Sequence, residues 1–245
     1  MEWGKAKTIL IFTFLLLNVL LGLQLWNHKI QLAGNYFDNR AMAQETEQIL
    51  RNRNIAVLQE IPKETPQLSE ITVKYHPEYH QDQRVFLSEP MPVEEVLYTK
   101  SIREPLDGVI ANSEEYAFDP VNSENGIYRY NQLHEGFPLF DVSLTFYSHN
   151  GHVTAFKQQY VDIVHSGETE NQRVLSAYMA VRHLAENVLS PGAVIEDVRL
   201  GYHGTIYNTD SILLFPKWRI SIQDGNLYYI HAVNGALEEV ERTSS

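Results

Sequence analysis

The stretch His76-Pro77-Glu78-Tyr79-His80 is where residue type and spacing come closest to a metal site. Histidines four positions apart share one face of a helix, and Zn²⁺ binds such imidazole pairs together with a third protein ligand. No helix carrying a third ligand is evident nearby, and residues 81–83 have the polar composition of a turn. We therefore interpret these histidines as surface residues, and we expect no metal and no other cofactor.

Patterns of the common hydrolase classes are missing from the sequence. Without cysteine there is no thiol nucleophile and no disulfide, and there is neither a G-x-S-x-G elbow nor a glycine-rich phosphate loop. The doublets Glu94-Glu95, Glu114-Glu115 and Glu238-Glu239 could supply a glycosidase acid and base. Adjacent side chains point in different directions, however, which favours solvated faces. We expect a protein that is not an enzyme, with a membrane-anchored hydrolase as an alternative.

An apolar run over residues 8–26 contains no charged side chain and has the length of a transmembrane helix. It is too long for a signal peptide and lacks an A-x-A cleavage pattern. One stripe of this helix is expected to contact another transmembrane helix, because Gly22 permits close approach and Asn18 can hydrogen-bond across the contact. The predicted interface consists of Ile11, Leu15, Asn18, Gly22 and Leu25. A monomeric span that tolerates one polar residue is the alternative.

The predicted orientation puts residues 1–7 in the cytoplasm and the rest of the chain outside the cell membrane. Lys5 and Lys7 precede the span, and large C-terminal domains are translocated largely regardless of charge. Residues 27–40 are polar and are expected to be a juxtamembrane linker. The net charge of −12 argues against nucleic acid as a partner. Because residues 8–26 form the predicted transmembrane helix, membrane lipid is their expected surrounding.

Residues 41–165 are expected to form a first α+β module. A short amphipathic helix begins at Ala41, and residues 55–58 and 71–75 have strand composition. The stretch from Met91 to Gly108 is predicted to be helical around residues 92–97, with Pro92 in the first turn and Gly108 beyond the end. Three strands follow within residues 127–162, where Asn150-Gly151 is typical of a hairpin turn.

Residues 166–245 are expected to form a second module of the same kind. A helix is predicted over residues 168–188, where apolar side chains follow the helical period. Strands are predicted at residues 194–202, 212–222, 227–233 and 236–240, with hairpin turns at Asp224-Gly225 and Asn234-Gly235. The phrase at residues 137–142, FPLFDV, resembles FPKWRI at residues 215–220. This supports two related modules, each a helix followed by antiparallel strands.

Three segments of the chain, in this order and spacing, resemble the YycI regulatory proteins of low-GC Gram-positive bacteria. They are the opening residues 1–9 with the apolar span and Asn18, the junction from Gln48-Ile49-Leu50 to Asn54-Ile55 with Pro62 after it, and the closing segment Pro216-Lys217-Trp218-Arg219-Ile220, Tyr229-Ile230-His231-Ala232 and Gly235. The closing segment is also similar to PepSY-type modules.

The resemblance implies a non-enzymatic regulator that acts with YycH on the sensor histidine kinase YycG, also called WalK, in a two-component system controlling cell-wall metabolism. In that family, contacts between transmembrane helices are held to adjust kinase activity, which would give the stripe around Asn18 a role. An envelope peptide- or glycan-binding module is the alternative of another class. A homodimer of the outer domain is left open.

Overall fold

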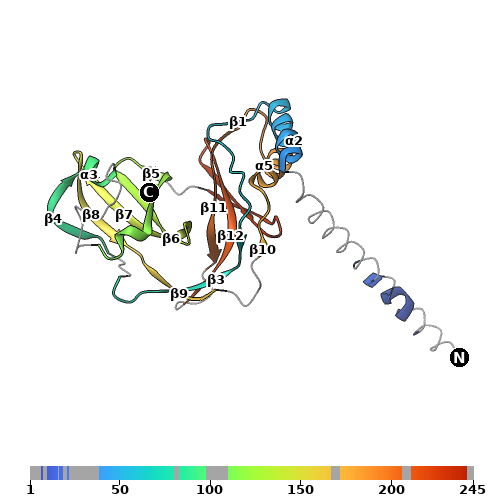
Figure 1. Cartoon of the computed structure of the whole chain (residues 1–245), viewed down its shortest axis with the longest axis horizontal. Coiled ribbons are helices and arrows are strands. Elements are labelled where there is room, and N and C mark those ends of the chain that lie inside the picture. Colours follow the sequence, from blue (N-terminus) through green and yellow to red (C-terminus); the bar gives the residue numbers. More distant parts are fainter. Residues whose placement is uncertain are drawn as a thin grey trace. The chain divides into compact units, whose positions relative to one another are not determined.

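Figure 1 shows the computed structural model, which describes Lys7, residues 10–15 and 17–18, Leu21, and residues 39–79, 83–97, 110–166, 172–205 and 211–241. The chain divides into two compact units, Met1–Glu45 and Thr46–Ser245. Most of the predicted tail, span and linker, which together cover residues 1–40, lies outside the described residues. The linker is predicted to end at residue 40 and the helix to begin at Ala41, whereas helix α2 (Asn39–Asn52) begins two residues earlier.

A five-stranded antiparallel sheet and a short helix form what we call the first lobe of the larger unit (Figure 1). Its strand order is β4-β8-β7-β6-β5. These elements are β4 (Val85–Pro92), α3 (Val93–Leu97), β5 (Tyr116–Glu124), β6 (Ile127–His134), β7 (Phe137–His149) and β8 (His152–Gln158), with a 3-10 turn at Ser113–Glu115 before β5. Val96, Leu144, Phe146 and Phe156 are fully buried in its core.

A second lobe is built around β12 (Ile212–Ile222), which pairs along its length with β11 (Val194–Thr205). The other edge of β12 has two partners: β3 (Ile71–Tyr75) pairs with residues 212–214, and β13 (Asn226–His231) pairs with residues 217–221. The outer strands are β14 (Leu237–Glu241) beside β13, β9 (Val161–Ser166) beside β3, and β1 (Ala56–Val57) parallel to β11. A separate pair joins β2 (Gln67–Leu68) to β10 (Gln172–Arg173).

The two lobes share one sheet network among the described strands. Tyr202 of β11 pairs in parallel with Leu139 of β7, and both side chains belong to a buried cluster that also contains Val73, Val142 and Ile212. Strand β3 precedes residue 166 and β9 ends at it, yet both pair within the second lobe. The fold is thus a mixed α+β domain dominated by a large β-sheet. Strand pairing joins residues from both sides of the predicted module boundary between residues 165 and 166. The relatedness of two modules and the PepSY-like character of the second stay predictions.

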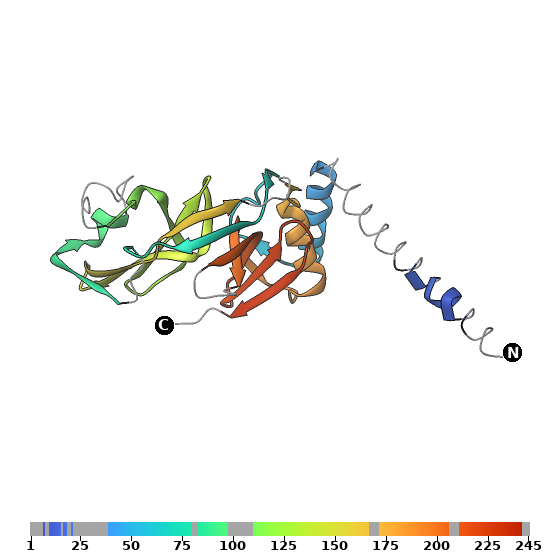
Figure 2. The ribbon, with the colours of Figure 1, turned by 90° about the horizontal axis from the view of Figure 1, so that it is seen from below.

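Helix α5 (Ala177–Asn187) is shorter than the predicted helix over residues 168–188. Gln172 and Arg173 are instead in strand β10, so the predicted start is wrong. The Ser176 side chain caps the helix by accepting a hydrogen bond from the Met179 amide. Upstream of this cap, the Leu175 amide donates to the Ala232 carbonyl, which fixes the chain in an extended form. The buried face of α5 covers the second lobe (Figure 2).

Local contacts hold α2 and α5 together in the larger unit. Figure 2 shows the two helices side by side, and the buried Thr46 hydroxyl donates to the Tyr178 carbonyl at 3.3 Å. Arg53, just after α2, donates to the carbonyls of Ala185, Glu186 and Leu189 at the C-terminal end of α5. A guanidinium satisfies helix-end carbonyls and complements the negative end of the helix dipole, so Arg53 acts as a cap supplied from another segment.

Several predicted elements are confirmed. Strands β3 and β12 have the predicted bounds, and β1, β6 to β8, β11, β13 and β14 lie within a few residues of theirs. The turn Asn150-Gly151 has positive φ at both residues, as a type I′ hairpin requires. Strands β4, β5 and β9 were not predicted as separate strands.

Candidate functional site

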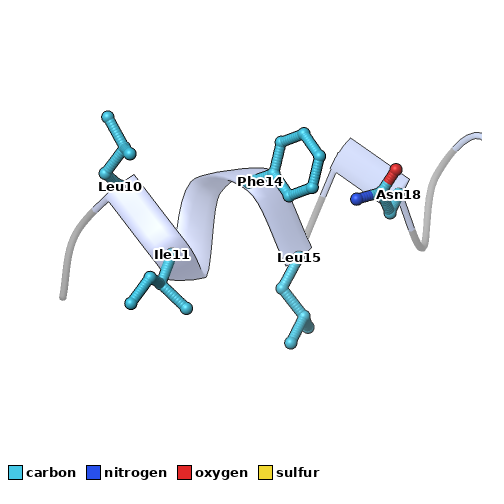
Figure 3. A pocket seen from close by; sticks show the side chains of 5 residues that line it. All are labelled: Leu10, Ile11, Phe14, Leu15 and Asn18. Atoms are coloured by element: carbon cyan, nitrogen blue, oxygen red, sulfur yellow. The ribbon is translucent and has the colours of Figure 1, made fainter. Parts of the chain in front are cut away.

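The predicted interface lies in the smaller unit, where residues 10–15 and 17–18 are helical. Figure 3 shows Ile11 and Leu15 pointing to one side of this helix and Leu10 and Phe14 to another. Together with Asn18 these side chains line a shallow hollow on the helix. Their apolar surfaces are exposed; Ile11 is 62% and Leu15 is 56% accessible. Such an apolar helical surface can pack against lipid or against another helix.

Three of the five predicted interface residues, Ile11, Leu15 and Asn18, are therefore described, and they border the same hollow. Leu10 and Phe14 border it as well, which the predicted stripe did not include. Gly22 and Leu25 lie outside the described residues. Within the described part of the chain, no helix meets the length and apolarity needed to cross a bilayer.

The histidines considered as metal ligands have other neighbours. His76 stacks on Tyr79 with ring centroids 4.5 Å apart, and its Nδ1 accepts a hydrogen bond from the Glu78 amide. His80 lies outside the described residues. No group of three or more potential metal ligands converges in the part of the chain that the structure describes.

A buried ion pair links the two lobes. Arg219 of β12 donates from Nη1 and Nη2 to the two carboxylate oxygens of Asp119 in β5, at 2.6 and 2.8 Å. The Arg219 side chain is 0% exposed and that of Asp119 is 1% exposed. The Arg219 guanidinium also lies 4.5 Å from the ring centroid of Phe140. Burial alone would raise the pKa of Asp119, but the hydrogen bonds and charge of Arg219 outweigh it, so the pKa lies below its ordinary value.

Two further charged side chains extend this pair along β11. Asp197 Oδ2 is 3.5 Å from Arg219 Nη2, and its Oδ1 is 3.6 Å from Arg199 Nη2. The Asp197 residue is 3% exposed, and Oδ2 accepts no hydrogen bond from the described residues. A buried carboxylate with an unused acceptor is costly unless another donor reaches it.

A second polar network surrounds His203 of β11. Its Nδ1 lies 2.8 Å from Asp141 Oδ1, its Nε2 lies 3.4 Å from Glu238 Oε1, and its ring stacks on Tyr229. Lys217 of β12 also binds Glu238. Burial raises the pKa of Glu238, but the hydrogen bond and charge of Lys217 and the charge of His203 outweigh it and lower the pKa. The network ties β14 to β11 and β12.

A comparison with models of protein families identifies the family of this chain. The model of the YycI protein family matches residues 37–233, which is well over half of the chain. The chain belongs to the YycI family. This family is non-catalytic and regulatory, its members are membrane-anchored, and membership implies a regulatory role associated with the YycG (WalK) system.

Other comparisons add little to the YycI assignment. No curated protein matches the chain. Among solved structures, an uncharacterized protein from Eubacterium rectale ATCC 33656 is similar at 13% identity and a TM-score of 0.34, covering 47% of this chain. The chain spans 42% of that protein, which is less than half of its length.

The closing segment used for the YycI resemblance is also where sequence reasoning missed structural residues. Lys217, Trp218 and Arg219 are all buried, and the Trp218 indole Nε1 donates to the Leu175 carbonyl at 2.8 Å. The repeated phrase at residues 215–220 marked this place without assigning it a role. Two of the suspected carboxylates have structural partners as well: Glu238 binds Lys217, and Glu115 accepts a hydrogen bond from Tyr160.

Proposed function

We propose that this YycI-family chain is a non-catalytic regulator of the sensor histidine kinase YycG (WalK) and acts together with YycH. The observation that supports it most is the family match over residues 37–233. In this proposal the N-terminus is cytoplasmic, residues 8–26 cross the cell membrane, and residues 41–245 lie outside. The kinase would control cell-wall metabolism through its two-component system.

The proposed contact with the kinase runs through the membrane helix. Ile11, Leu15, Asn18, Gly22 and Leu25 would face the partner helix, and the exposed apolar surface of Ile11 and Leu15 supports this choice. In lipid, close packing beside glycine and hydrogen bonds from asparagine hold helices together, and such bonds average about 0.6 kcal/mol. That energy corresponds to roughly a threefold change in association for Asn18 alone.

A regulator of this kind requires no reacting group. It shifts the kinase between two states only by the difference in its binding free energy for them, and couplings between sites are typically about 1–3 kcal/mol. Several weak helix contacts and an outer-domain contact with YycH are sufficient to supply a difference of that size.

The test of this proposal is co-purification from the native membrane after crosslinking. The full-length chain is compared with a version in which residues 8–26 are replaced by an unrelated poly-Leu/Ala span. Recovery of the kinase and YycH with the native span only supports regulation through the helix. Recovery with both spans moves the contact to the outer domain, and recovery with neither contradicts the proposal. Crosslinked dimers of the chain itself would show whether it also self-associates.

A point variant sharpens the same test. Asn18→Leu with Gly22→Leu removes the polar group and the close approach while keeping the span apolar, so kinase recovery should fall at least threefold. Thr13→Leu with Gln24→Leu is the control, because it also introduces two leucines but on the opposite stripe of an ideal helix. Equal recovery from both variants would contradict the assigned face.

A further inference from the structure

A groove runs beside β11 where the two lobes meet, and it takes no part in the proposed membrane contact. Its volume is about 470 Å³. One wall is the extended segment 59–66, one is residues 136–138 at the start of β7, and the floor includes Leu200 and Trp218. A cavity of this size is within the range that holds a short peptide or small ligand.

The groove follows the edge of β11 rather than one of its faces. Four consecutive residues, Asp197 to Leu200, line it. Successive side chains of a strand point to opposite faces, so consecutive residues line one groove only where it runs along the strand's edge.

This edge of β11 has free pairing capacity among the described strands. β1 pairs in parallel with residues 194–195, and its last contact is the Leu58 amide donating to the Ile195 carbonyl. β7 pairs with β11 only at Tyr202. Between these points, from Asp197 to Leu200, no described strand pairs with β11 on the side away from β12. Gly201 lies against the Pro138 carbonyl of β7, so the open stretch ends before it. It is about 13 Å long at roughly 3.3 Å per residue, the length of a short strand.

The charges around the groove favour a cationic occupant. Three carboxylates, those of Glu60, Glu64 and Asp197, line it against one guanidinium, that of Arg199, for a formal net charge of −2. Glu60 is exposed and pairs with the exposed Lys63, so that pair contributes little to the field. Asp197 supplies the independent indication, because its buried Oδ2 accepts no hydrogen bond from the described residues and has only Arg219 Nη2 near it, at 3.5 Å.

We propose that this groove binds an extended peptide with lysine or arginine side chains, which adds a strand to the open edge of β11 and places a cationic group near Asp197. Main-chain hydrogen bonds to β11 would supply affinity, and alternate side chains would meet the apolar floor and the carboxylates. The same strand addition covers an edge that otherwise exposes unpaired backbone groups. The site does not depend on the membrane helix, so it can fail without affecting the proposed kinase contact.

The test uses the full-length chain in detergent micelles and fluorescein-labelled peptides, measured by fluorescence anisotropy at low ionic strength, where exposed charges are least screened. The probes are Val-Lys-Val-Lys-Val, its glutamate counterpart, and the lysine peptide with N-methyl groups on alternate amides. N-methylation blocks strand pairing without changing charge. The lysine peptide should bind at least tenfold more tightly than either of the other two.

Groove variants locate the binding. Glu60→Lys with Glu64→Lys should weaken binding of the lysine peptide at least fivefold. Glu78→Lys with Glu124→Lys changes the net charge equally at exposed positions outside the groove lining and should leave binding unchanged. Hydrogen exchange of the β11 amides between residues 197 and 200 should slow when the lysine peptide binds.

Three results would overturn the site. The first is no binding of the lysine peptide up to about 1 mM. The second is equal binding of the N-methylated peptide, which would indicate charge attraction without strand addition. The third is evidence that the peptide binds elsewhere, either as an equal response of the groove and control variants or as unchanged exchange of the β11 amides.

Discussion

Replacing Asp119 by asparagine removes the negative charge that faces the buried Arg219 guanidinium while keeping the side chain nearly the same size. Both side chains are shielded from water, so the arginine cannot recover hydration. Breaking a buried pair by removing one partner typically costs about 3–5 kcal/mol. Domains are stable by only about 5–15 kcal/mol, so Asp119→Asn should remove a large part of the total.

A double variant separates the interaction energy of the ion pair from the cost of leaving either charge buried alone. Arg219→Met removes the guanidinium and leaves Asp119 unpaired, so it should also cost about 3–5 kcal/mol. Combining Asp119→Asn with Arg219→Met leaves no buried charge from the pair, so the double variant should cost less than the sum of the singles by roughly 1–3 kcal/mol. The nearby Asp197 keeps this recovery incomplete, because it also faces Arg219 at 3.5 Å.

Urea denaturation followed by Trp218 fluorescence measures these differences. Trp218 is buried, and a Trp3→Phe, Trp26→Phe background leaves it as the only tryptophan. Glu186→Gln is the control, because its exposed pair with Arg182 should contribute less than about 0.5 kcal/mol. A cost below about 1 kcal/mol for Asp119→Asn, or strictly additive costs in the double variant, would refute the assignment of a coupled buried pair.

Three further outcomes follow from described contacts. Because the folded-state pKa of Asp119 is lowered, its ionised form stabilises the fold above the unfolded pKa of about 3.9, and this stability is lost as pH falls through the folded pKa. The difference in urea midpoint between the parent chain and Asp119→Asn should therefore shrink in that acid range, and a constant difference would contradict it. Arg53→Met removes the cap of α5 and should cost about 1–3 kcal/mol, whereas Arg51→Met, which loses only an exposed pair at 3.7 Å, should cost under about 0.5 kcal/mol in the same assay. Trp218→Phe loses the hydrogen bond to Leu175 and leaves a small void, so the thermal midpoint should fall by a few degrees, and an unchanged midpoint would argue against a role for that bond.

Strands with a regular pattern were predictable from the sequence, and irregular ones were not. β3 was predicted from its strand composition, and its residues alternate between buried and less buried. β4 contains Pro90 and Pro92 and has a register shift between Phe86 and Met91, as an edge strand tolerates. β5 carries a buried aspartate, Asp119, a residue type that is rarely buried unless it is paired. Its partner is one hundred residues away in the chain, and no local pattern reports it.

Proline in β12 shows how tertiary pairing explains a residue that local rules misplace. Proline is normally confined to a strand's first residue, an edge or a bulge, but Pro216 lies inside β12 opposite Tyr202. Its carbonyl accepts from the Ala232 amide, so its missing N–H points to the same edge. On that edge, pairing with β3 ends at Leu214 and pairing with β13 begins at Lys217. Pro216 therefore occupies the gap between two ladders, where neither partner strand needs its N–H.

Tertiary contacts also explain why two cationic residues of β12, Lys217 and Arg219, are buried. Two cations at alternate positions of a strand normally indicate a solvated face, with Trp218 facing the core. Here both faces are covered: Leu175 meets Trp218 on one side, while Asp119 and Glu238 meet Arg219 and Lys217 on the other. The first lobe thus lies against the charged face of β12, and the same approach of β7 toward β11 leaves the open edge beside Asp197. Because the proposed peptide groove forms only between the lobes, a variant that weakens the Asp119 and Arg219 pair without unfolding the chain should also weaken peptide binding.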